Sequence, residues 1–185
     1  MTRRQLASIA TLACHAPSAA LLPLLKRLLD EELRRWRAFK EQAKVDQNRG
    51  GLATNEARSS WTLQYQRAFH AINCAETKAL MREYLLNEDF GYSAALVLVE
   101  QWRDVNEPSD TNIWKSGPNF SRVTEKRAAR LSDPSGSSEE ADAIFTVIEQ
   151  LIGEEATETM RKHAITLAIV ATALPHGRRD ATIKA

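Results

Sequence analysis

Residues 75–102, AETKALMREYLLNEDFGYSAALVLVEQW, decide the fold predicted for this chain. The first part places apolar residues on one side of a helix, namely Leu80, Met81, Tyr84 and Leu85. The segment from Asn87 to Gly91 then predicts a turn. Tyr92 to Val99 is apolar on nearly every side, and such a helix must be covered by several neighbours. The stretch therefore predicts a helical hairpin that lies between other helices.

Three helices are expected before this hairpin. The first spans about Arg3 to Cys14, and the second runs from its N-cap at Ser18 to about Lys44, with Pro23 near its start. Two ion pairs are expected on the exposed side of the second helix, Asp30–Arg34 and Glu31–Arg35. The third helix is expected to begin at a cap, Thr54 or Asn55, and to bury Trp61, Tyr65, Ala68, Phe69 and Ile72.

Two loops and further helices are expected after the hairpin. Residues 106–120 carry two prolines and no helical period, which predicts a long loop, and 132–137 predicts a second one. A short basic helix is expected between them, at 122–131. Ser137 and Glu140 fit a capping box for a helix that buries Ala141, Ile144, Phe145, Ile148, Leu151 and Ile152. Another helix follows at about Ala156 to Ala173, and a last one begins at Arg179 without a cap after Ala185.

The pattern contains no convincing strand, so the expected fold class is all-α. Antiparallel hairpins with short turns can be stacked as an α-solenoid, in which each unit contacts mainly its neighbours. The alternative is a compact irregular helical bundle around one closed core. The stacked array is favoured, as a single repeat domain over 1–185 that forms a fragment of a longer array.

Composition excludes several classes of protein. The 185 residues are 43% hydrophobic with a net charge of +1, so a buried core is feasible and no strong field favours nucleic acid or an anionic membrane. Two cysteines in unlike contexts suit a reducing cytoplasm. No apolar run approaches the roughly 20 residues that cross a bilayer. Polar residues interrupt the N-terminal segment at helical spacing, which favours an amphipathic helix over an export signal.

Residues 67–102, RAFHAINCAETKALMREYLLNEDFGYSAALVLVEQW, resemble a HEAT-type repeat, and 154–185 are similar to parts of two more units. TNEARSSWTLQYQRAF (54–69) and ALPHGRRDATI (173–183) further resemble the helical-repeat region of large bacterial NACHT-type (STAND) NTPases. That resemblance implies a sensor or scaffold solenoid beside a P-loop module. No G-x-x-x-x-G-K-[ST] occurs in this chain, so any NTPase activity would reside elsewhere in a parent protein.

Candidate catalytic and metal-binding groups are weak. His70 and Cys74 could meet on the third helix as a thiolate–imidazole pair, but no third group supports them. The carboxylate pairs Glu31/Glu32, Glu88/Asp89 and Glu154/Glu155 are typical of solvated charge. Histidines and cysteines lack metal-ligand spacing. The expected protein is therefore not an enzyme and needs no metal or cofactor.

The leading hypothesis is a cytoplasmic protein-interaction module whose partner is another protein or another region of the parent chain. Trp114 and Phe120, in the long loop, are the expected partner-binding residues. Exposed repeat ends are also expected to self-associate. The alternative is a HEAT-like nucleic-acid-binding protein that uses Arg34, Arg35, Arg37 and Lys40, or the basic residues at 122–130. Nearby acidic residues weaken this alternative, because phosphate binding needs a local excess of positive charge.

Overall fold

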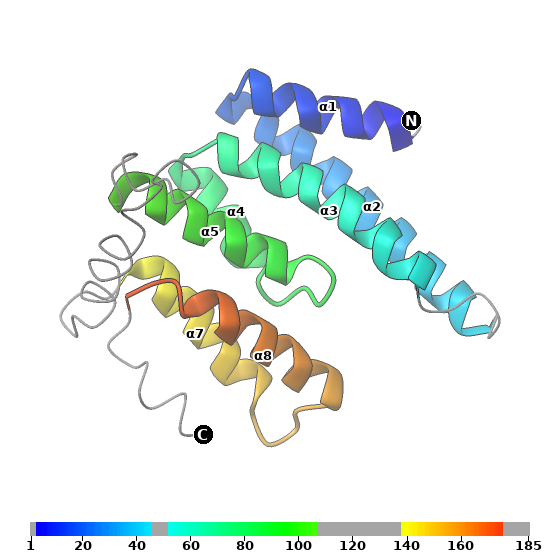
Figure 1. Ribbon diagram of the computed structural model, residues 1–185, viewed down its shortest axis with the longest axis vertical. Coiled ribbons are helices and arrows are strands. Elements are labelled where there is room, and N and C mark those ends of the chain that lie inside the picture. Colours follow the sequence, from blue (N-terminus) through cyan, green and yellow to red (C-terminus); the bar gives the residue numbers. More distant parts are fainter. Residues whose placement is uncertain (1–2, 46–51, 107–137, 176–185) are drawn as a thin grey trace, which may run out of the picture. The chain divides into compact units, whose positions relative to one another are not determined.

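The computed structural model describes residues 3–45, 52–106 and 138–175, and these segments are helical with no strand among them (Figure 1). The predicted all-α class is thus confirmed. The chain divides into two compact units, Met1–Val97 and Leu98–Ala185, with the division inside one helix. Each unit is described by itself, and the single repeat domain over 1–185 stays a prediction.

In the first unit, α1 (Arg3–His15), α2 (Leu22–Val45) and α3 (Leu52–Ala71) lie alongside one another, and α1 packs mainly on α3 (Figure 1). The helix α4 (Ala75–Tyr84) and the first part of α5 (Gly91–Asn106) complete the unit. The helix α3 begins at Leu52, so the prediction of a cap at Thr54 or Asn55 was wrong. Both residues lie inside α3.

The start of α2 follows from its local sequence. The Ser18 side chain accepts a hydrogen bond of 3.3 Å from the backbone N–H of Ala20, so Ser18 caps a short 3₁₀ turn, Ala19–Leu21, instead of α2 directly. Pro23 is the second residue of α2. Its missing N–H is harmless there, because the first N–H groups of a helix have no partner inside the helix.

An aromatic cluster forms the core of the first unit. Phe90 is fully buried, and its ring lies 5.7 Å from that of Tyr84 and 6.4 Å from those of Trp61 and Phe69. Tyr65 contacts the rings of Trp61 and Phe69 in turn. Aromatic residues of α3 and α4 thus pack against Phe90, which lies in the turn that precedes α5. The buried face predicted for α3 is confirmed from Trp61 to Ile72.

In the second unit, α7 (Glu139–Leu151) and α8 (Glu158–Ala171) form a hairpin (Figure 1). Ser138 caps α7 by accepting a 3.0 Å hydrogen bond from the N–H of Ala141, so the prediction of Ser137 as the cap was one residue early. Thr157 caps α8. The predicted core of α7 is present except for Ile152, which follows the helix and is 48% exposed. The prediction of this core missed two buried residues, Glu140 and Val147.

Several predictions fall outside the described residues. They concern most of the long loop at 106–120, the basic helix at 122–131, the loop at 132–137 and the helix from Arg179. None of the helices in the described segments combines the length and the hydropathy that a bilayer-spanning helix needs.

Candidate functional site

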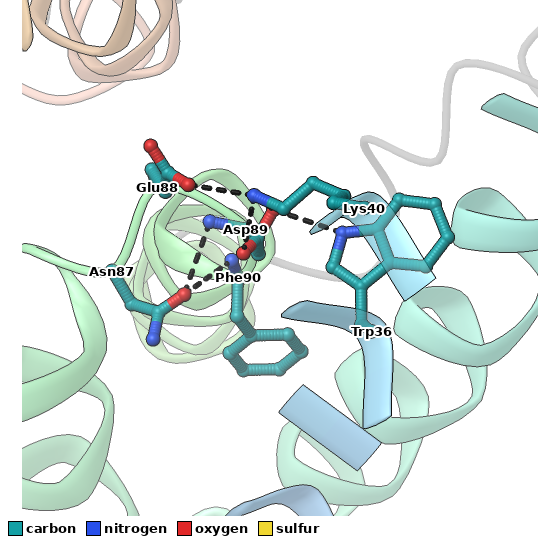
Figure 2. A network of polar contacts seen from close by, with 6 residues as sticks. All are labelled: Trp36, Lys40, Asn87, Glu88, Asp89 and Phe90. Atoms are coloured by element: carbon teal, nitrogen blue, oxygen red, sulfur yellow. Dashed lines mark hydrogen bonds and ion pairs between the residues drawn. The ribbon is translucent and has the colours of Figure 1, made fainter. Parts of the chain in front are cut away.

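Within the described segments, a network of polar contacts surrounds the turn between α4 and α5, residues 85–90, called here the 85–90 turn (Figure 2). The Asn87 side-chain oxygen accepts hydrogen bonds from the backbone N–H groups of Asp89, at 3.0 Å, and Phe90, at 3.1 Å. The Asn87 carbonyl accepts another from Gly91. Asn87 therefore holds the backbone in a tight turn, as asparagine side chains commonly do.

This turn sends two neighbouring side chains in different directions. Phe90 enters the aromatic core, while the carboxylate of Asp89 points to α2 (Figure 2). Asp89 is only 5% exposed. Its Oδ1 accepts hydrogen bonds from Trp36 Nε1, at 2.9 Å, and from Lys40 Nζ, at 2.8 Å. Its Oδ2 accepts another from Lys40 Nζ, at 3.0 Å. A buried carboxylate needs such partners, because an unpaired charge in the interior is costly.

Lys40 also donates a hydrogen bond of 2.6 Å to Glu88 Oε1. Burial lowers the pKa of Lys40, but the hydrogen bonds to Asp89 and Glu88 outweigh it, so the net pKa lies above the ordinary value. The amine is thus held protonated by two carboxylates. A protonated lysine is neither a nucleophile nor a general base at neutral pH, so the arrangement suits positioning of helices.

A second set of contacts joins the end of α4 to α2, nearer to the start of α2 than Trp36 and Lys40. The Tyr84 hydroxyl donates a hydrogen bond of 2.6 Å to Asp30, and Lys26 pairs with Glu83 at 2.9 Å. Lys26 also lies 5.0 Å from the centre of the Tyr84 ring. Burial, then the hydrogen bond to Asp30, raise the pKa of Tyr84. These contacts and those of Asp89 fix α4 and the 85–90 turn along α2.

The structure corrects the solvated-charge interpretation for two of the paired carboxylates. Asp89 is buried in the contacts above, and Glu32 is 2% exposed and lies 3.4 Å from Arg35. Glu88 is half-exposed, and Glu154 and Glu155 are exposed as expected. The sequence around Asp89 gave no signal for its burial, because its partners Trp36 and Lys40 lie about fifty positions earlier in the chain.

His70 and Cys74 do not share a helix. The helix α3 ends at Ala71, and Cys74 occupies the N-cap position of α4, so the prediction that both residues lie on the third helix was wrong. The Cys74 sulfur lies 3.3 Å from the hydroxyl of Thr77, which itself donates to the carbonyl of Ile72. Among the described residues, no group of three or more His, Cys, Asp or Glu could hold a metal ion.

Two buried polar groups stand out in the aromatic core. The indole N–H of Trp61 and the hydroxyl of Tyr65 have no hydrogen-bond partner within the described segments. Burial, then the nearby charge of Glu32, raise the pKa of Tyr65. A buried hydroxyl without a partner lowers stability. Tyr65 therefore contributes to folding through its ring, and its hydroxyl is a specific target for mutation.

The basic residues of α2 are largely engaged in ion pairs. Arg34 and Arg35 both contact Glu31, at 2.6 and 3.0 Å, and Lys40 contacts Glu88 and Asp89. The predicted Glu31–Arg35 pair is thus confirmed. Asp30, which was predicted to pair with Arg34, instead accepts a hydrogen bond from Tyr84. Arg37 is exposed. The basic residues at 122–130 and the predicted partner-binding residues Trp114 and Phe120 lie outside the described segments.

No protein-family model, curated protein or solved structure matches the chain. Its contacts within each unit are therefore the basis for a functional proposal. The likeness to HEAT repeats and to NACHT-type NTPases stays a prediction from the sequence.

Proposed function

We propose that this chain is a non-catalytic protein-interaction module: a HEAT-like α-solenoid segment that acts as sensor or scaffold in a larger bacterial NTPase-type protein of the cytoplasm. Its partner would be another protein or another region of the parent chain. The proposal combines the hairpin pattern of the sequence with the surface that the described helices leave exposed.

The observation that carries the proposal is the outer side of α8. Leu167, Val170 and Ala171 are buried, yet Ile165 and Ile169 on another side of the same helix are 62% and 66% exposed. A surface helix ordinarily has one apolar stripe, which faces its core. A second stripe is expected where a helix has neighbours on two sides, as in a stacked array or at an interface.

The 85–90 turn supports the same role. Its buried carboxylate contacts Trp36 and Lys40 on α2, so the turn holds neighbouring helices at a set spacing. Leu86 and Tyr92, on either side of the buried turn residues, are 53% and 42% exposed. Exposed apolar residues at the turns of a helical frame suit binding of a partner protein. Side chains held on a rigid scaffold lose little conformational entropy when they bind.

The proposal is tested by affinity capture from cells that express the full parent protein, with captured proteins identified by mass spectrometry. Wild-type chain is compared with Ile165→Glu/Ile169→Glu and with Trp114→Ala/Phe120→Ala. Leu12→Glu/Leu63→Glu is a matched control for the isoleucine double variant, because it adds the same two negative charges at other exposed apolar residues (59% and 42% exposed).

We expect one protein to be captured in stoichiometric amount by wild type and by the control, and lost from at least one of the double variants. Equal recovery of every captured protein with all four baits would contradict the proposal. Retention of nucleic acid that falls steeply with added salt would favour the nucleic-acid-binding alternative.

A further inference from the structure

We draw no further inference here: the strongest candidate, the exposed apolar face of α8 that includes Ile165 and Ile169, carries none because nothing in the described segments shows what covers it.

Discussion

Trp36 donates a hydrogen bond of 2.9 Å from its indole nitrogen to Asp89, a residue 53 positions further along the chain. Lys40, one turn after Trp36, contacts the same carboxylate. The contact joins α2 to the 85–90 turn, and Phe90 next to Asp89 enters the aromatic core. A single turn thus holds both a polar and an apolar contact between helices distant in sequence.

Asp89→Ala is expected to lower the free energy of unfolding by about 3 kcal/mol, because it leaves the buried indole N–H without its acceptor and removes one of the two carboxylates that pair with Lys40. Urea denaturation followed by circular dichroism measures the change. Glu88→Ala is the matched control one residue away; Glu88 is half-exposed and screened by solvent, so its loss should cost less than about 1 kcal/mol. Equal effects of the two substitutions would contradict the assigned role of Asp89.

Removal of one hydroxyl should have opposite effects at two buried tyrosines. Tyr65→Phe is expected to raise stability by about 1 kcal/mol, because the Tyr65 hydroxyl is buried without a hydrogen-bond partner among the described residues. Tyr84→Phe is expected to lower it by about 2 kcal/mol, since Tyr84 donates to Asp30. Thermal and urea denaturation compare the two variants. A loss at Tyr65 as large as that at Tyr84 would show that its hydroxyl has a partner.

Stability should fall at alkaline pH. The pKa values of Tyr65 and Tyr84 lie above their ordinary 10.0, and that of Lys40 lies above 10.5, so the folded state holds these protons more tightly than the unfolded state. Their stabilisation is complete below the ordinary values and is lost as pH rises through the raised ones. Urea midpoints measured from neutral pH to above 10.5 check this. The decline should be shallower in Tyr84→Phe, and an unchanged slope there would contradict the assignment.

The start of α7 provides a local test in the second unit. Ser138→Ala should lower stability by about 1 kcal/mol, because it removes the side chain that accepts from the N–H of Ala141. Thr146→Ala is the control, since Thr146 is exposed and its hydroxyl only donates to Asp142 on the same helix. Hydrogen exchange at Ala141 should accelerate in the first variant alone; protection that persists would argue that another group caps the helix.

Helical periodicity was sufficient to predict the helices of the described segments and most residues of their buried faces. Boundaries were less accurate where polar residues can either cap a helix or lie within it: Thr54 and Asn55 are inside α3, and the cap of α7 is Ser138. Such choices depend on packing that a single sequence does not contain.

The polar contacts of the 85–90 turn were not predicted, because their partners lie about fifty positions away. Glu88 and Asp89 have the same sequence context, yet one is half-exposed and the other buried. Only the position of α2 distinguishes them. The second apolar stripe of α8 was missed for a different reason: Ile165 and Ile169 belong to a helix that is apolar on several sides, and the sequence does not show which side faces α7.

The stacked arrangement is tested most directly by a spin-label distance between the first and last described helices. Nitroxides are attached to Leu12→Cys on α1 and Thr159→Cys on α8, both exposed, with Cys14 and Cys74 replaced by Ala and labelled chain diluted in unlabelled chain. A solenoid predicts a distance above about 30 Å, because each intervening helix layer adds about 8–10 Å. A distribution centred below about 20 Å, as for two helices in contact, would contradict it and favour a closed bundle.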